Sequence, residues 1–177
     1  DSGDGRNYGI ELTFEKFFSQ QYYFLTTVSL YDTQYRAADG NWYDSAYNYN
    51  YTFNIVGGKE FTVGKKQNNT IGVNAKTLLN GGKRATPIDQ ALFDQTGEVR
   101  IDQGLRNTLE LDSYFRLDAS IYYRLNRPKA AHRISLDVQN VTNRLNVDTI
   151  FYDGATGQIG SNYQLELIPF INYRIEF

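Results

Sequence analysis

Tyr163–Phe177 reads YQLELIPFINYRIEF, and this stretch at the end of the 177-residue chain decides the fold class. Every second residue from Tyr163 onward is apolar or aromatic, whereas the intervening positions carry most of the polar side chains, Glu166 and Asn172 among them. A period of two predicts a β-strand with two different faces. A strand this long, with aromatic residues at both ends of its apolar face, is typical of a strand that crosses an outer membrane in a barrel.

The composition is compatible with a membrane barrel. The chain contains 15 Tyr, 11 Phe and 1 Trp but only 3 Pro, which favours long uninterrupted strands. No run of about 18 apolar residues is present, which excludes a transmembrane helix. The net charge of −2 gives no electrostatic reason to expect nucleic acid as a partner. The absence of cysteine excludes disulfides and thiolate metal sites.

Alternating segments recur along the chain, so about seven antiparallel strands are expected in all. The connections between the strands alternate between short turns and longer segments. Outer-membrane barrels show the same asymmetry, with short periplasmic turns and long external loops. Gly57-Gly58 predicts a bulge or bend within one strand. The strands expected before the last one are residues 8–18, 22–35, 49–63, 70–79, 114–125 and 132–152. The short turns are expected at 19–21, 64–69 and 126–130, and the longer connections at 36–48, 80–112 and 153–160.

Four segments carry recurring signatures: NYGIEL at 7–12, YFRLDAS at 114–120, LDVQNVTN at 136–143 and the terminal YRIEF at 173–177. Together, and in this order, they resemble the last strands of TonB-dependent outer-membrane receptors, especially those of Bacteroidetes. The resemblance implies a barrel of about 22 strands with an N-terminal plug in its lumen. The plug, the TonB box and the earlier strands are not in this sequence. Residues 1–177 are therefore expected to be the C-terminal segment of such a barrel domain, cut from a longer exported protein.

Polar side chains alternate with the apolar ones and are expected to face the lumen. Arg116 and Asp118 share the face opposite the lipid, where they can pair with each other, with adjacent strands or with the plug. Asp137 and Arg174 occupy equivalent positions on later strands. For this set we expect a structural role in the lumen wall rather than contact with a transported substrate. Asn140 and Asn143 flank an expected irregularity, because asparagine tolerates the left-handed backbone conformation.

Aromatic residues near the strand ends predict membrane-interface girdles rather than a ligand cage. Tyr173 and Phe177 would lie near the inner interface, and the resemblance implies that they also form the assembly signal read by the barrel-insertion machinery. The residues expected at the outer interface are Tyr49, Tyr51, Tyr152 and Tyr163.

Nothing in the sequence predicts an enzyme. His132 is the only histidine, and no serine or carboxylate can be placed beside it from the sequence. No cofactor site, catalytic residue or metal-ligand motif is expected. Weak Ca²⁺ binding to the acidic residues of 39–44 and 148–153 stays open.

The expected function is nutrient import across the outer membrane of a Gram-negative bacterium. By resemblance, the cargo would be an iron chelate, cobalamin, a glycan or a peptide, and the TonB system would act through the plug. The expected partners are outer-membrane lipid, the remaining barrel strands and plug, the barrel-insertion machinery and a surface lipoprotein. The alternative is a small free-standing outer-membrane or surface β-protein that acts as an adhesin or structural module.

Overall fold

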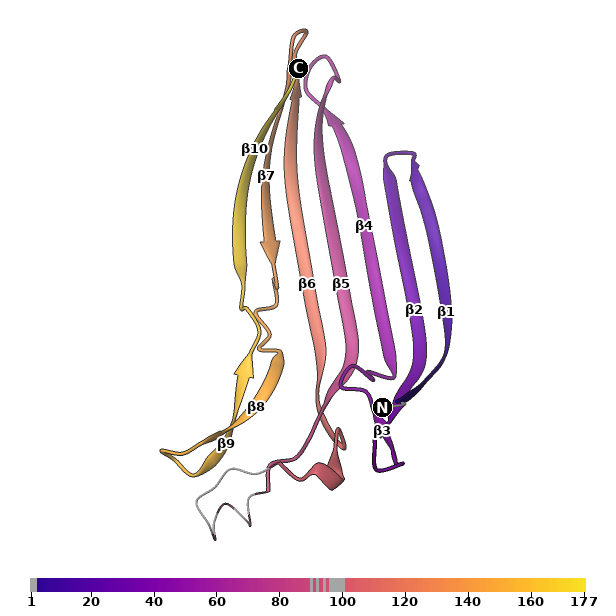
Figure 1. Cartoon of the computed structure of the whole chain (residues 1–177). Coiled ribbons are helices and arrows are strands. Elements are labelled where there is room, and N and C mark those ends of the chain that lie inside the picture. Colours follow the sequence, from indigo (N-terminus) through magenta and orange to yellow (C-terminus); the bar gives the residue numbers. More distant parts are fainter. Residues whose placement is uncertain (1–2, 90, 92, 94, 96–100) are drawn as a thin grey trace.

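The computed structural model of this chain describes residues 3–89, 91, 93, 95 and 101–177. It is an all-β fold of antiparallel strands (Figure 1), which confirms the predicted fold class at that level. The main sheet has the order β1-β2-β4-β5-β6-β7-β10, with β3 paired to β2, and a second sheet contains only β8 and β9. The sheet is open rather than closed into a barrel, and β1 and β10 form its edges in the described part of the chain. The strands are β1 (Asp4–Ser19), β2 (Tyr22–Arg36), β3 (Trp42–Asp44), β4 (Tyr51–Val63), β5 (Asn69–Ala85), β6 (Leu109–Asn126), β7 (Ala131–Gln139), β8 (Val147–Asp153), β9 (Gln158–Tyr163) and β10 (Ile168–Glu176), with one 3₁₀ helix, η1 (Gln103–Leu105).

The tight turns and the longer connections lie at opposite ends of the sheet (Figure 1). We call these the tight-turn end and the loop end. The β1–β2 turn uses Gln20 and Gln21 at φ of 53° and 67°, and the β4–β5 turn uses Gly64 at φ of 90°. The three short turns were all predicted at their observed positions. The C-terminus lies at the tight-turn end, whereas the hairpin β8–β9 projects from the loop end.

The predicted connection over 80–112 is wrong at both ends, because β5 continues to Ala85 and β6 begins at Leu109. Gly81 and Gly82 were interpreted as a loop, yet they lie inside β5. A Cβ atom on Gly81 would collide with the carbonyl oxygen of Tyr49, and one on Gly82 with that of Leu111. Glycine therefore permits a close backbone approach at a point where the strand register shifts. Residues 90, 92, 94 and 96–100 of this connection lie outside the described residues.

Two long strands predicted from alternation are each divided in two. The segment 132–152 becomes β7 and β8, and the closing segment 163–177 contains an irregular stretch at 164–167 before β10. Asn140 and Asn143 have φ of 50° and 51°, which confirms the predicted irregularity between them. These left-handed residues end the β6–β7 ladder and turn the chain out of the main sheet.

No bulge occurs at Gly57-Gly58, since the register of β4 with both β2 and β5 runs through these residues without a shift. Gly58 makes room for the side chains of Asn74 and Tyr23. The nearest ring atom of Tyr23 lies 2.6 Å from where a Cβ atom on Gly58 would stand. The glycine therefore serves side-chain packing.

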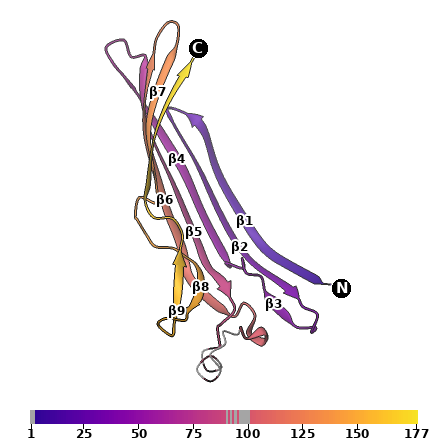
Figure 2. The same cartoon turned by 60° about the vertical axis from the view of Figure 1, so that its left-hand side comes forward.

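Strand register gives the main sheet two distinct faces. On the apolar face, Leu12, Val28 and Phe53 stand in one cross-strand row that continues to Leu79 and Phe115. This face is uncovered: Ile10 is 70% exposed and Ile171 77%. Figure 2 shows the sheet as a single curved layer. The only buried hydrophobic residues in the described part of the chain are Tyr43 and Tyr122.

Candidate functional site

The polar face of the main sheet carries the lumen-wall residues predicted from the sequence. Arg116 and Asp118, neighbours on β6, form a two-pronged ion pair with N–O distances of 2.6 and 2.8 Å. The carboxylate of Asp118 also accepts a 3.0 Å hydrogen bond from the backbone of Asn140. The two side chains therefore pair with each other on one strand, and their place in a lumen wall stays a prediction.

Asp137 and Arg174 lie on the same face but do not contact each other. Asp137 accepts hydrogen bonds from Asn172 on β10 at 2.7 Å and from Ser135 at 2.9 Å. Arg174 stands in one register row with Arg133 and Arg124. Glu176 pairs with two of these three arginines, at 2.8 Å from Arg124 and 3.5 Å from Arg174. This row gives the polar face a basic margin at its tight-turn end.

Two tyrosines of the polar face were not predicted as site residues. Tyr122 on β6 reaches across β5 to donate a hydrogen bond to Glu60 on β4. Tyr23 on β2 donates to Asn74 at 3.1 Å, and Asn74 donates to Ser120 at 3.1 Å. Both tyrosines reach past a neighbouring strand to a residue on the strand beyond it. Alternation within one strand gives no signal for such a contact.

A cavity of about 310 Å³ opens on the polar face where β7 ends and β10 begins. Its lining joins Arg116 on β6 with side chains of the irregular stretch 164–167 and of β8. The lining residues include Tyr114, Arg116, Gln139, Asp148, Gln164 and Glu166. The mixture of amide, carboxylate and guanidinium groups suits a polar ligand or a polar protein surface.

Asparagine side chains replace missing strand pairing around this cavity. Asn146 is 4% exposed, and its amide both accepts from the backbone N–H of Phe115 and donates to the Phe115 carbonyl, each at 2.9 Å. Asn140 is 2% exposed and donates to the carbonyl oxygens of Arg144 at 3.0 Å and Leu165 at 3.3 Å. The asparagine-rich segment after β7 is thus a structural element, as predicted for Asn140.

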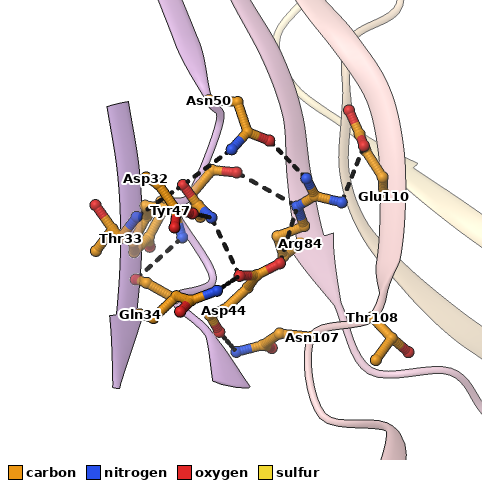
Figure 3. A network of polar contacts seen from close by, with 12 residues as sticks. Asp32, Thr33, Gln34, Asp44, Tyr47, Asn50, Arg84, Asn107, Thr108 and Glu110 are labelled. Atoms are coloured by element: carbon orange, nitrogen blue, oxygen red, sulfur yellow. Dashed lines mark hydrogen bonds and ion pairs between the residues drawn. The ribbon is translucent and has the colours of Figure 1, made fainter. Parts of the chain in front are cut away.

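Arg84 at the end of β5 is the centre of a polar network at the loop end (Figure 3). Its guanidinium donates to Asn50 at 2.6 Å and forms ion pairs with Glu110 at 2.9 Å and Asp44 at 3.8 Å. The side chain of Arg84 is only 15% exposed. The network joins β3, the segment 45–50 and β6, so the connections at this end are braced against one another.

Asn48 and Asn107 extend the same network. Asn48 is 1% exposed, donates to Asp32 at 2.7 Å and accepts from the backbone N–H of Thr33 at 3.0 Å. Asn107 donates to the carbonyl oxygen of Asp44 at 2.6 Å. Sequence reasoning missed this network because its members come from separate segments; the short polar residues between the tyrosines of 43–51 were the available signal.

Two acidic residues of the loop end organise turns. The hydroxyl of Tyr43 donates to Asp39 at 2.6 Å, and this bond, together with the backbone N–H of Asn41, holds the pKa of Asp39 below its usual range. Asp153 accepts from the backbone of Ala155, which lowers the pKa of that carboxyl as well. No cluster of His, Cys, Asp or Glu fit to hold a metal ion occurs among the described residues, at 39–44 and 148–153 or elsewhere.

The four tyrosines predicted for the outer girdle all lie toward the loop end, but in different surroundings. Tyr49 packs on Tyr47 with ring centroids 6.2 Å apart, and Tyr51 packs on Phe53 at 5.8 Å. Tyr152 lies against Phe93 of the 86–108 connection at 3.8 Å. Tyr163, at the end of β9, is 52% exposed.

The aromatic residues predicted for the opposite end lie at the tight-turn end of the apolar face. Phe177 follows β10 and is fully exposed. The hydroxyl of Tyr173 lies 2.8 Å from Nδ1 of His132, and the two rings stack. The predicted turn histidine is therefore a strand residue whose ring is bound to a tyrosine. The structure shows no serine or carboxylate beside it in the described region.

The apolar face contains a shallow hollow of about 360 Å³. Its lining combines β-branched and leucine side chains from β5, β6, β7 and β10, among them Ile71, Ile121, Leu136 and Ile171. Such a surface suits a hydrocarbon chain.

No helix in the described residues is long and apolar enough to span a membrane. Comparison with protein-family models, with curated proteins and with solved structures finds no match for this chain.

Proposed function

We propose that this chain forms part of the barrel wall of a TonB-dependent outer-membrane receptor that imports a nutrient such as an iron chelate, cobalamin, a glycan or a peptide. The observation that carries the proposal is the pair of opposed faces: an uncovered apolar face over seven strands, backed by a hydrogen-bonded polar face. Lipid on one side and a filled lumen on the other satisfy both faces.

A water-soluble sheet buries its apolar face under a second layer. Among the described residues, the two strands outside the main sheet are β8 and β9, which extend from its loop end instead of covering a face. Leu12 and Phe14 are 55% and 61% exposed in the middle of β1. A bilayer supplies the missing cover without any further protein layer.

The polar face fits the lumen side of the wall. Several of its charged groups have partners within the sheet: Arg116 pairs with Asp118, Arg124 pairs with Glu176, and Asp137 accepts hydrogen bonds. The cavity beside Arg116 and the braced connections of the loop end provide surfaces for cargo or for a surface lipoprotein. In this arrangement the loop end is external and the tight-turn end periplasmic.

The open edges favour the receptor over a small free-standing β-protein. β1 is an edge strand of 16 residues, and a long exposed edge of that kind pairs readily with another strand. Further barrel strands on β1 and β10 would remove both edges. An adhesin built from this sheet alone would leave them open.

Arginine substitution on opposite faces of β10 tests the membrane orientation. Ile171→Arg puts a charge on the apolar face, at a cost of about 2–4 kcal/mol near the bilayer midplane, whereas Asn172→Arg puts it on the polar face. We expect the first variant to be lost from the outer membrane and the second to be retained, as measured by membrane fractionation of intact cells. Equal levels of the two variants would contradict the proposal.

Epitope tags and uptake assays separate the remaining alternatives. A tag at Gly40 or Gly154 is expected to be accessible on intact cells, and a tag at Lys66 only after the outer membrane is permeabilised. Deletion of the gene is expected to abolish TonB-dependent uptake of one nutrient class. Unchanged uptake with a loss of cell attachment would favour the adhesin.

A further inference from the structure

We propose that Lys16, Tyr22 and Lys59 form a binding site for the phosphate of an anionic phospholipid at the tight-turn end of the apolar face. The inference rests on the proposed function, because it requires the apolar face to lie in lipid. It goes beyond that function by assigning a specific lipid contact to three residues.

Lys16 holds its ammonium group over an aromatic ring. The Nζ atom lies 3.7 Å from the ring centroid of Tyr22. It donates to Oγ of Ser19 at 2.7 Å, to the Ser19 carbonyl oxygen at 3.0 Å and to the Tyr22 carbonyl oxygen at 3.3 Å. The side chain is half-buried. The charge is therefore held at the level of the β1–β2 turn, with only neutral oxygens and a ring around it.

Lys59 stands beside the same tyrosine in the register of the sheet, on the strand opposite β1. Lys59 on β4 is the register partner of Tyr22 on β2, so the two side chains share the apolar face. Its Nζ atom lies 5.2 Å from the ring centroid of Phe61, and the side chain is exposed. Tyr22, 37% exposed, is thus flanked by a cation on each neighbouring strand.

Among the described residues, neither ammonium group has a carboxylate partner. None of the ion pairs formed among the described residues includes Lys16 or Lys59. Along β1, β2 and β4 the register places no acidic residue on this face until Asp32, near the loop end. Two cations on the strands that flank Tyr22, without an acidic residue near them on this face, favour an anion as partner.

The surroundings point to a lipid phosphate rather than to a phosphate free in solution. Phe24, 40% exposed, continues the surface from Tyr22 toward the middle of the apolar face, whereas Phe61 lies on the tight-turn side of Lys59. Acyl chains would lie along Phe24 while the phosphate meets the lysines, which extend toward the polar headgroups.

The charge of the tight-turn end agrees with this partner. The turns that follow β4 and β6 carry Lys65, Lys66, Arg127 and Lys129 and no acidic residue, and the turn after β1 is uncharged. Such a margin is attracted to a surface of anionic headgroups. The site would therefore lie in the periplasmic leaflet, which is the leaflet that the proposed orientation assigns to this end.

Flotation of the full-length protein that contains this chain, with vesicles, tests the site. The vesicles are phosphatidylcholine alone or a mixture with phosphatidylglycerol. The variants are Lys16→Gln and Lys59→Gln, which remove the charge and keep a hydrogen-bond donor, with Lys76→Gln on the polar face as the matched control. We expect each site variant to weaken binding to the anionic vesicles about fivefold, without an effect on neutral vesicles. The control is expected to bind like the unaltered chain.

The outcomes separate this inference from the proposed function. Binding of the unaltered chain that does not depend on phosphatidylglycerol would overturn the site and leave the membrane function standing. An equal loss in Lys76→Gln would also overturn it, since general electrostatic attraction would then explain the preference. A chain that binds neither kind of vesicle would instead contradict the proposed membrane function itself.

Discussion

Asn146 is expected to hold β6 in place beyond the end of β7. The β6–β7 ladder stops near Ala119 and Val138, and the next bond to β6 comes from the backbone N–H of Val141, which donates to Leu117 at 2.7 Å. Phe115, two residues further, is paired by the side chain of Asn146. A side-chain amide thus replaces a strand residue, and its removal should open β6 locally.

The size of the effect follows from the two bonds. Asn146→Ala leaves the N–H and the carbonyl group of Phe115 without partners in a site where the native side chain is 4% exposed. An unsatisfied buried polar group costs about 1–3 kcal/mol, so we expect a loss of about 2–4 kcal/mol. Asn146→Asp keeps an acceptor for the N–H but sets a carboxylate oxygen against the Phe115 carbonyl, and should cost at least as much.

Amide hydrogen exchange of Phe115 measures this opening directly. A loss of about 2–4 kcal/mol corresponds to exchange that is faster by about 30-fold to 1,000-fold. The control is Asn162→Ala, which removes a single exposed hydrogen bond to Thr149 and should change stability by less than about 0.5 kcal/mol. Unchanged exchange in Asn146→Ala, or an Asn146→Asp variant as protected as the unaltered chain, would refute the pairing role.

Three further outcomes are expected. Deletion of Phe177 should lower the outer-membrane level of the full-length protein and leave material in the periplasm. An unchanged level would show that the residue belongs to the aromatic girdle and is not an assembly signal. Arg84→Met should increase proteolytic cleavage within 36–50, while the amide hydrogen exchange of the strands of the main sheet stays constant. Cleavage equal to that of the unaltered chain would show that the network does not brace the connections at the loop end. Tyr43→Phe should raise the pKa of Asp39 in an NMR titration, because the phenol is the main cause of its depression. A carboxyl whose pKa is depressed in the folded state stabilises that state above its normal pKa of 3.8, and this stabilisation is lost as the pH falls through the folded-state pKa. The stability of the 36–48 connection should therefore depend less on pH in this variant. An unchanged pKa of Asp39 would contradict the assigned cause.

Alternation within single segments predicted the strands well where the pairing is regular. β2 was expected over 22–35 and extends over Tyr22–Arg36. The short turns were found as well. Those at 64–69 and 126–130 contain glycine, asparagine or proline, whose local backbone preferences act without the rest of the fold, and the turn at 19–21 is a short polar break between two alternating segments. The Arg116–Asp118 pair belongs with these features, since its two residues lie on one face of one strand.

Glycine was one source of wrong predictions. Gly81-Gly82 and Gly57-Gly58 look alike in the sequence, yet the first pair lies at a register shift with close backbone contacts, and the second makes room for the ring of Tyr23. What a glycine does in a strand depends on the atoms opposite it. Those atoms come from other strands and are not visible in the local pattern.

The amino-acid sequence by itself determined that the chain is all-β, where most strands run and which side chains share a face, because alternation follows from the geometry of a single extended strand. Only the tertiary structure decided that β7 ends at Gln139 and that Asn146 takes over its pairing, since these depend on which backbone groups of β6 remain free. The same holds for the Arg84 network and for Lys16 and Lys59 around Tyr22. Their members come from different strands, and only the register of the sheet brings them together.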